Sequence, residues 1–244
     1  MDIEVLTDAA AAAHRAAGLV AAEARDAVRD RGRFVLAISG GTTPWVMLHA
    51  LSLLDDVPWT RMHVVQVDER IAPGGHADRN LTHLSASLLA PLDAARGGTV
   101  QVHPMPVEAD DLDEAAVGYA RTLAGIAGSP PVLDLVHLGL GADGHTASLV
   151  PGDPVLEVED ADVALTGMYQ GRRRMTLTFP IINRARRVLW LVTGQDKAAM
   201  LARLRRGDRT IPAGRIRQDH AIAVADLAAA GPQPPAGGLA GVNR

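Results

Sequence analysis

Residues 139–149, Gly-Leu-Gly-Ala-Asp-Gly-His-Thr-Ala-Ser-Leu, place a carboxylate and a histidine two positions apart in a glycine-rich segment. Histidine is the side chain best suited to take and give a proton near neutral pH. The glycines permit a tight turn in which Asp143 can orient the imidazole of His145. The pattern favours acid–base catalysis by His145 over the alternative, in which the histidine caps a helix opened by Thr146 and Ser148.

A second glycine-containing segment, Ile-Ser-Gly-Gly-Thr-Thr-Pro at residues 38–44, follows an apolar run. Its proline predicts that a helix begins there, and backbone N–H groups at a helix start bind phosphate well. The segment matches neither a P-loop nor a dinucleotide-binding turn, so an ordinary strand-to-helix turn is the alternative. The candidate phosphate ligands are Ser39, Gly40, Gly41, Thr42 and Thr43.

Val-Asp-Glu-Arg at residues 67–70 ends another predicted strand. Arg70 could bind an anion or stabilise a developing oxyanion. Asp68 could act as a base or orient one. A salt-bridged turn that only stabilises the loop would use the same residue types.

The basic residues also suggest an anionic ligand. Of the 24 lysines and arginines, only Lys197 is a lysine, and it follows a predicted strand in a turn at residues 193–197. A single compact, flexible ammonium among arginines favours a specific role. Arg173 and Arg174 end a Gly-Arg-Arg-Arg run before another predicted strand, so they are candidate anion contacts, although a solvated charge run is the commoner origin of such a pattern.

The composition narrows the class of protein. The chain has 244 residues, 48% hydrophobic and only 3% aromatic, a net charge of −4 and no cysteine. Few aromatic rings and no positive excess argue against nucleic-acid binding, and disulfides and thiolate catalysis are excluded. No apolar run approaches the roughly 20 residues that cross a bilayer, and Asp2 and Glu4 stand where a signal peptide would be basic. We therefore expect a cytoplasmic protein with no membrane partner.

Strand and helix patterns alternate along the chain, which predicts one α/β domain over residues 1–230 with an open, mostly parallel, Rossmann-like sheet flanked by helices. The strands at 175–179 and 188–193 are expected to form a small local antiparallel element. A Pro/Gly-rich tail at 231–244 is expected to be mobile. The other predicted strands lie at 33–38, 63–67, 99–103, 133–138 and near 163, and the helices at 8–31, 44–54, 80–90, 109–127 and 195–206.

Together these segments resemble those of the 6-phosphogluconolactonases, within the wider glucosamine-6-phosphate isomerase/6-phosphogluconolactonase superfamily. The matching pieces are ISGGTTP, VDER, GLGADGHTASLVPG, RRMTLTFPIIN and LVTGQDKA, in family order over residues 38–197. The resemblance implies hydrolysis of 6-phospho-D-glucono-1,5-lactone to 6-phosphogluconate in the oxidative pentose phosphate pathway, with no metal and no organic cofactor. The implied partner is a phosphorylated sugar lactone, and we expect a monomer or weak homodimer.

By position in these motifs, His145 resembles the family's acid/base, with Asp143 and Arg70 beside it. Lys197 and residues 39–43 resemble its phosphate ligands. Two segments depart from the family pattern: Tyr-Gln-Gly-Arg at 169–172 replaces a proline-rich run, and Ala-Asp-Arg-Asn at 77–80 makes Arg79 a further candidate contact. The expected oxyanion donors are backbone amides of the glycine turn or Arg70.

Two other functions are open to a chain with these motifs. The related isomerases, which deaminate glucosamine 6-phosphate, continue the histidine motif with Phe-Asn-Glu-Pro, whereas residues 148–151 here are Ser-Leu-Val-Pro and lack that carboxylate. A non-catalytic sugar-phosphate sensor would keep the phosphate loop but would not need His145. The intact histidine motif therefore favours hydrolysis.

Overall fold

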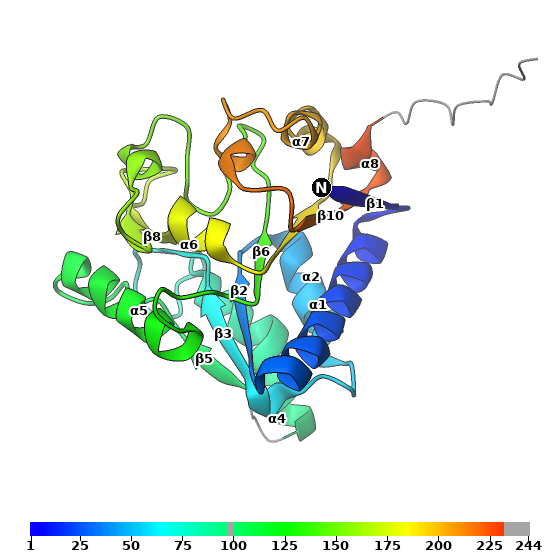
Figure 1. Cartoon of the computed structure of the whole chain (residues 1–244), viewed down its shortest axis with the longest axis horizontal. Helices are drawn as coiled ribbons and strands as arrows, with labels where there is room; N and C mark the ends of the chain where they lie inside the picture. The colour runs from blue at the N-terminus through cyan, green and yellow to red at the C-terminus, as the bar shows by residue number, and fades with distance from the viewer. Residues whose placement is uncertain (97–99, 232–244) are drawn as a thin grey trace, which may run out of the picture.

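The computed structural model describes residues 1–96 and 100–231. A seven-stranded sheet in the order β1-β10-β9-β6-β2-β3-β5 forms its centre, with helices on both faces (Figure 1). Every pairing in this sheet is parallel, which confirms the predicted open parallel sheet. Its strands are β1 (Asp2–Leu6), β2 (Phe34–Ile38), β3 (Met62–Gln66), β5 (Gln101–His103), β6 (Leu135–Leu138), β9 (Arg187–Val192) and β10 (Ala221–Asp226).

Helices cover both faces of the sheet, so its central strands are apolar on both sides. In β2, Phe34 and Leu36 pack into the core shared with α1 (Ala9–Arg31) and α2 (Thr42–Ser52). Val35 and Ala37, at the alternate positions, pack into the opposite core. That core includes side chains of α5 (Leu112–Ala127), α6 (Phe179–Arg184) and α7 (Ala198–Arg205).

The remaining helical segments are short. The helix predicted at 80–90 is longer than expected, because α3 (Asn80–Leu84) continues through a π-helical turn (Ser85–Leu89) into α4 (Ala90–Arg96). A last helix, α8 (Leu227–Ala230), follows β10. Single 3-10 turns occur at η1 (Trp59–Arg61), η3 (Pro154–Glu157), η4 (Gln195–Lys197) and η5 (Pro212–Arg215).

The predicted antiparallel element exists, but its predicted pairing is wrong. The small sheet has the order β4-β8-β7 and consists of β4 (Asp68–Arg70), β8 (Arg174–Leu177) and β7 (Val163–Leu165). Strand β9, the expected partner of β8, lies in the parallel sheet between β10 and β6. The reason is that Pro180 lies in the first turn of α6, so the chain between the two strands is a helix rather than a hairpin.

Strands β1 and β10 were not predicted from the sequence. They pair with each other in parallel at the edge of the sheet, between the first and the last parts of the chain. Short strands whose partners are so distant carry little local signal. The predicted strand at 99–103 begins at Gln101, and the expected tail lies outside the described residues except for Gly231.

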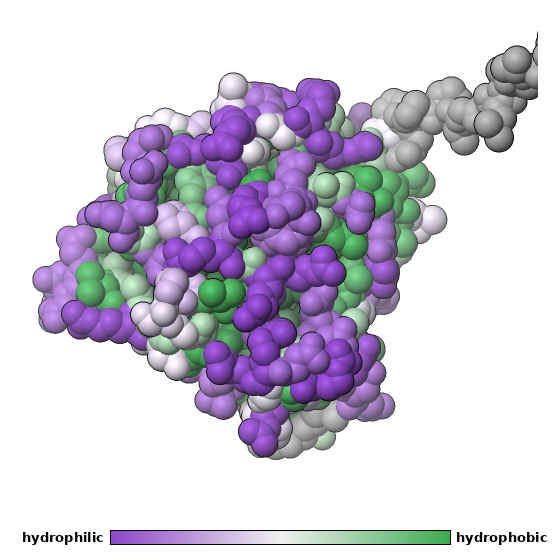
Figure 2. Space-filling view, viewed as in Figure 1, coloured by the Kyte–Doolittle hydropathy of each residue, from purple (hydrophilic) through white to green (hydrophobic). Residues whose placement is uncertain are grey.

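The face of the molecule seen in Figure 2 is largely hydrophilic. Hydrophilic side chains cover most of the face in Figure 2, with hydrophobic ones visible between them. In residues 1–96 and 100–231, no helix combines the length and apolar character that a membrane crossing requires. Among the described residues, the exposed large hydrophobic side chains are Val46, Leu53, Val117, Met168 and Leu227.

The strand order decides where a ligand can bind. From β2 the chain builds β3 and β5 on one side, and then β6, β9 and β10 on the other. The reversal lies between β2 and β6, and a crevice forms beyond the carboxyl ends of the strands at such a point. Because β9, β6, β2 and β3 are consecutive neighbours, the segments that follow these four strands meet at one edge of the sheet.

Candidate active site

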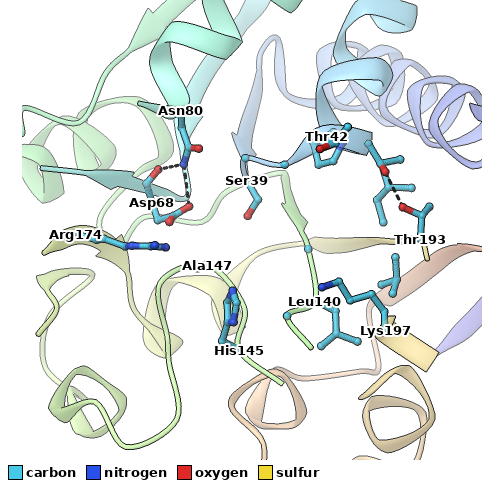
Figure 3. A pocket seen from close by; sticks show the side chains of 18 of the residues that line it. Ser39, Thr42, Asp68, Asn80, Leu140, His145, Ala147, Arg174, Thr193 and Lys197 are labelled. Carbon is cyan, nitrogen blue, oxygen red and sulfur yellow. Dashed lines mark hydrogen bonds between the residues drawn. The ribbon is translucent and has the colours of Figure 1, made fainter. Parts of the chain in front are cut away.

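A cavity of about 440 Å³ lies beyond the carboxyl ends of these four strands (Figure 3). It is where most of the residues selected from the sequence come together. The predicted residues in its wall are Ser39, Gly40, Gly41, Thr42, Thr43, Asp68, Arg70, His145, Arg174 and Lys197. Asp143 lies behind this wall, in contact with His145.

His145 and Asp143 form a hydrogen-bonded pair in the glycine turn after β6. Nδ1 of His145 donates to Oδ1 of Asp143 over 2.5 Å, and the backbone N–H of His145 donates to the same oxygen over 3.1 Å. Because a carboxylate only accepts, this contact assigns a proton to Nδ1, and in the neutral imidazole the lone pair is then on Nε2. A Cβ on Gly141 would stand 2.1 Å from Nδ1, so the turn needs glycine there.

The electrostatics of the pair keep Asp143 ionised. Burial alone would raise the pKa of Asp143, but the backbone N–H and the imidazole of His145 hold that pKa below its ordinary value. The side chain of His145 is 24% exposed and its ring points into the cavity (Figure 3). The pair therefore presents a basic nitrogen supported by a fixed negative charge.

The helix that the sequence suggested after His145 does not form. Thr146 Oγ1 donates to the carbonyl of Gly139 over 2.9 Å instead of capping a helix, and Ser148 Oγ donates to Asp68 over 2.6 Å. Ala147 has a φ of 51°, which interrupts a right-handed helix. The next helical turn is η3, so residues 139–153 form an irregular loop across the cavity.

The loop between β2 and α2 lies against Asn80. Its Ser39 is almost fully buried, and a Cβ on Gly40 would lie 2.0 Å from Oδ1 of Asn80. Gly41 is the N-cap of α2 and makes no side-chain cap hydrogen bond. The start of an eleven-residue helix thus borders the cavity, and both its dipole and its backbone N–H groups favour an anion there.

Lys197 reaches the same part of the cavity from the end of β9 (Figure 3). The hydroxyl oxygens of Thr43 and Thr193 lie 2.6 Å apart and connect the two strand ends. The Lys197 ammonium is 2.8 Å from Asp196, a carboxylate whose side chain is 64% exposed. The backbone N–H of Gly194 donates to Asp226 over 3.1 Å, which positions the turn that carries Lys197.

His137 lies beneath the β2–α2 loop and is fully buried. Its Nδ1 accepts a 3.4 Å hydrogen bond from the backbone N–H of Ser39. Burial lowers the pKa of His137 from its ordinary value to about 3. The ring is therefore neutral near pH 7.

This burial predicts a pH dependence of stability. An unfolded histidine takes up a proton near pH 6.5, whereas folded His137 takes one up only near pH 3. The contribution of His137 to the free energy of unfolding is present above pH 6.5 and is lost as the pH falls toward 3. Between pH 6.5 and pH 5 the loss is about 1.5 kcal/mol. Urea unfolding of the wild-type protein and of His137→Asn at both pH values measures this loss of unfolding free energy. The same pH slope in both proteins would contradict the prediction.

Asp68 and Arg70 follow β3 and contact Asn80 rather than the histidine pair. Asp68 Oδ2 accepts from Ser148, and Asp68 Oδ1 lies 3.3 Å from Nδ2 of Asn80 (Figure 3). One terminal nitrogen of Arg70 donates to Oδ1 of Asn80 over 2.5 Å. In the described residues Nε of Arg70 is buried without a hydrogen-bond partner. Asp68 thus orders the wall around Arg70, and Asp143 orients His145.

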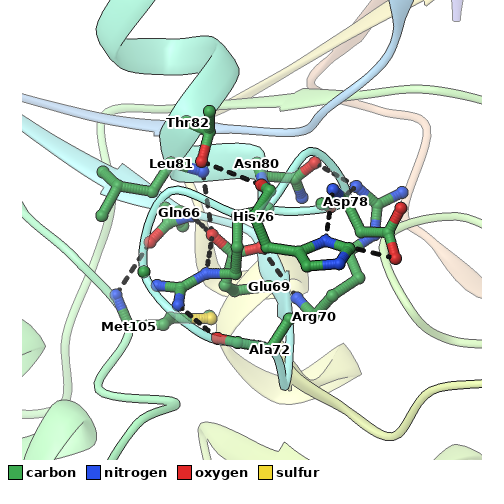
Figure 4. Close-up of polar contacts among 12 residues, drawn as sticks. Gln66, Glu69, Arg70, Ala72, His76, Asp78, Asn80, Leu81, Thr82 and Met105 are labelled. Atoms are coloured by element: carbon green, nitrogen blue, oxygen red, sulfur yellow. Dashed lines mark hydrogen bonds and ion pairs between the residues drawn. The ribbon is translucent and has the colours of Figure 1, made fainter.

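Arg79, the further candidate contact from the sequence, forms an ion pair with Glu69. Glu69 is fully buried and accepts hydrogen bonds from the backbone N–H groups of Arg70, Asn80 and Leu81 (Figure 4). Arg79 is 2% exposed, lies 3.1 Å from Glu69 and is absent from the cavity wall. Its role is to neutralise a buried carboxylate that anchors the loop to α3.

The three consecutive arginines at 172–174, the last of which begins β8, have different surroundings. Arg174 is 5% exposed and lines the cavity, and its Nε has no hydrogen-bond partner among the described residues. Burial lowers the pKa of Arg174, and the charge of Asp68 opposes this effect. Arg172 pairs with Asp78 over 2.6 Å, whereas Arg173 is exposed, donates to the carbonyl of Thr166 and does not reach the cavity.

Sequence patterns missed three residues that complete the site. Asn80 and Thr193 line the cavity, and Ser148 connects Asp68 with Arg174. A polar residue at a helix start after a strand-end loop was the available signal for Asn80. In residues 1–96 and 100–231, no three histidine or carboxylate side chains converge to hold a metal ion.

Comparisons with known proteins identify the family that the chain resembles. The sequence profile of the family "Glucosamine-6-phosphate isomerases/6-phosphogluconolactonase" matches residues 7–225. A 6-phosphogluconolactonase of Synechocystis sp. is 38% identical over 206 residues, which cover 83% of this chain and 84% of that protein.

Solved structures support the fold. The 6-phosphogluconolactonase of Thermotoga maritima superposes with a TM-score of 0.78 at 24% identity, covering 92% of this chain and 98% of that one. A monomeric glucosamine-6-phosphate deaminase superposes equally well, with a TM-score of 0.79 at 18% identity, covering 94% and 99%. The fold alone therefore does not separate the two activities. By sequence and fold, the chain belongs to the glucosamine-6-phosphate isomerase/6-phosphogluconolactonase family.

Proposed function

We propose that the protein hydrolyses 6-phospho-D-glucono-1,5-lactone to 6-phospho-D-gluconate. The observation that carries the proposal is the His145–Asp143 pair at one side of a cavity whose other side has a helix start and a lysine. Such a cavity suits a small substrate with a phosphate at one end and a carbonyl at the other. The lactonase names of the relatives are consistent with it.

The phosphate is assigned to the β2–α2 loop and Lys197. This part of the wall provides hydroxyl groups, a helix start and a mobile ammonium, which match a dianion. Binding there orients the sugar ring and directs its carbonyl carbon toward His145. Positioning of this kind converts binding energy into rate.

His145 is assigned as the general base. Its Nε2 takes a proton from a water molecule as the water oxygen attacks C1 of the lactone. The resulting imidazolium then donates that proton to the ring oxygen as the C1–O bond breaks, which regenerates neutral His145. A lactone is an activated ester, so the reaction needs no covalent nucleophile and no metal or organic cofactor in this proposal.

Arg70 and Arg174 are the favoured donors to the oxyanion. Each has a buried Nε with no hydrogen-bond partner among the described residues. Two amides of the glycine turn are less suitable, because Gly141 donates to the carbonyl of His145 and Gly144 donates to that of Gly141. Prearranged charge at the developing oxyanion is a large contribution to catalysis.

Hydrolysis is favoured over isomerisation because the segment after His145 lacks the glutamate of the isomerase motif. Val150 stands where the resembling isomerases have glutamate, and it is only 8% exposed. Ser148, two residues earlier, is fully buried against Asp68. Residues 148–151 therefore provide no carboxylate in the place where the resembling isomerases have one.

We further propose that the enzyme acts in the oxidative pentose phosphate pathway in the cytoplasm, as a monomer or weak homodimer folded as one domain over residues 1–230. The absence of cysteine is compatible with a reducing compartment. The absence of a positive net charge and the small number of aromatic residues support a small-molecule rather than a nucleic-acid ligand.

The test is an assay of lactone opening with freshly generated 6-phosphogluconolactone, corrected for spontaneous hydrolysis. We expect the wild-type protein to accelerate this opening and to release no ammonia from glucosamine 6-phosphate. The unphosphorylated lactone is the control for the phosphate site, and a much lower kcat/KM is expected with it. Ammonia release without lactone opening would reverse the assignment.

A further inference from the structure

Tyr169 lies against the His145–Asp143 pair and belongs to the 169–172 segment that departs from the family pattern. Its hydroxyl donates to Oδ2 of Asp143 over 3.2 Å, the oxygen that His145 does not use. Its ring meets the His145 imidazole edge-on, with centroids 5.5 Å apart and planes at 67°. On the other side, the guanidinium carbon of Arg174 is 4.9 Å from the centre of the Tyr169 ring. One side chain thus touches three candidate site residues.

The backbone that carries Tyr169 is well defined. Tyr169 and Arg172 exchange two backbone hydrogen bonds, of 3.0 and 3.2 Å, at the tip of the hairpin between β7 and β8. Gln170 and Gly171 both have positive φ, 51° and 78°, as the favoured two-residue hairpin turn requires. The side chain of Arg172 pairs with Asp78, which ties the hairpin tip to the loop after β4. The position of Tyr169 is therefore determined by contacts on both sides.

We propose that Tyr169 is a positioning residue for the reaction: through its hydroxyl and its ring it holds the Asp143 carboxylate and the His145 imidazole in the orientation in which Nε2 faces the substrate. Asp143 is 40% exposed, and without this donor Oδ2 loses its hydrogen bond, so that the backbone N–H and the imidazole of His145 hold the carboxylate through Oδ1 alone. The kinetic part of the proposal rests on the proposed lactonase function.

The kinetic test compares wild type, Tyr169→Phe, Asp143→Asn and the double variant. Tyr169→Phe keeps the ring and removes the donor, so kcat is expected to fall about fivefold with KM within about twofold. In the Asp143→Asn background, Tyr169→Phe should lower kcat by less than about twofold, because the carboxylate oxygen that accepts from the tyrosine hydroxyl is already altered. An equal loss in both backgrounds would show that Tyr169 does not act through Asp143.

Two further variants separate the effect of the Tyr169 hydroxyl from that of its ring and from a general disturbance of the hairpin. Tyr169→Leu removes both the donor and the ring contacts, and we expect a larger loss of kcat than with Tyr169→Phe. Met168→Ala changes the adjacent side chain, which is 68% exposed, and should leave the kinetics unchanged. If Met168→Ala reduced kcat as much as Tyr169→Phe, a disturbed hairpin would explain both and the proposal would fail.

A spectroscopic arm tests the contact without any catalytic activity. The chain has two tyrosines, Tyr119 and Tyr169. When the protein is labelled with ¹³C at the tyrosine Cζ, NMR gives a separate signal for each of them. Burial and the charge of Asp143 raise the pKa of Tyr169, and burial raises that of Tyr119. Asp143→Asn should lower the pKa of Tyr169 and leave that of Tyr119 unchanged. No change at Tyr169 would overturn the proposal, even if wild type failed to open the lactone and the proposed function itself were wrong.

Discussion

Replacing His145 by glutamine is expected to lower kcat for lactone opening by about 10³-fold, within the range that a positioned acid–base group contributes. The reason is that Nε2, the lone-pair nitrogen left by the contact between Nδ1 and Asp143, faces the cavity. Glutamine retains a polar group near Asp143 but cannot take a proton from water. Initial rates measured with fresh lactone at several enzyme concentrations separate the catalysed from the spontaneous reaction.

The matched control for this variant is His49→Gln, an exposed histidine on α2 outside the cavity wall. It should behave as wild type in kcat, in KM and in thermal unfolding. Asp143→Asn should fall between the two, because it keeps His145 but loses the charge that orients the ring. If His145→Gln retained wild-type kcat, the base would have to be sought elsewhere in the cavity, with Asp68 as the next carboxylate.

Replacing Lys197 by alanine is expected to raise KM for the phosphorylated lactone by about 10²-fold, the usual cost of removing one partner of a charged pair. Lys197 lines the cavity beside the β2–α2 loop, and its ammonium is paired only with the exposed Asp196 among the described residues. A phosphate can replace or share that weak surface pair. The effect is expected mainly in KM because Lys197 is proposed to bind the phosphate and takes no part in the proton transfers proposed for His145.

The substrate without a phosphate sharpens this test. With unphosphorylated gluconolactone, Lys197→Ala should change kcat/KM by less than about twofold, because no phosphate is present to lose its partner. Arg205→Ala, an exposed cation on α7, controls for a general loss of positive charge. Equal losses with both substrates would mean that Lys197 supports the fold of the cavity and does not hold phosphate.

Much of the fold could be predicted because its signals are local. Buried strands such as β2 and β9 are short apolar runs followed by glycine turns, and α1 is an alanine-rich run that begins after Asp8. The pairing of β8 with β4 could not be predicted in the same way, since β4 lies far from β8 in the chain, although β7, the other partner, directly precedes β8. Pairing depends on which faces are buried in the whole molecule, and neighbouring strands in the chain are only the commonest partners.

The site was predicted in the same uneven manner. His145 and Asp143 interact within one turn, so their contact could be predicted from their spacing in the sequence. Arg79 and Arg174 could not be distinguished by sequence, because both are arginines in charged loops. The structure pairs Arg79 with buried Glu69 and leaves Arg174 in the cavity wall.

The sequence by itself determined the chemical groups of this protein: a histidine with its carboxylate, a helix start for an anion, and one lysine at a strand end. Each depends on residues close together in the chain, where the backbone leaves few arrangements. Only the tertiary structure decided which strand ends are neighbours, that Asn80 joins Asp68 to Arg70, and that Tyr169 lies against His145. Those contacts connect segments far apart in sequence, and burial of the shared core brings them together.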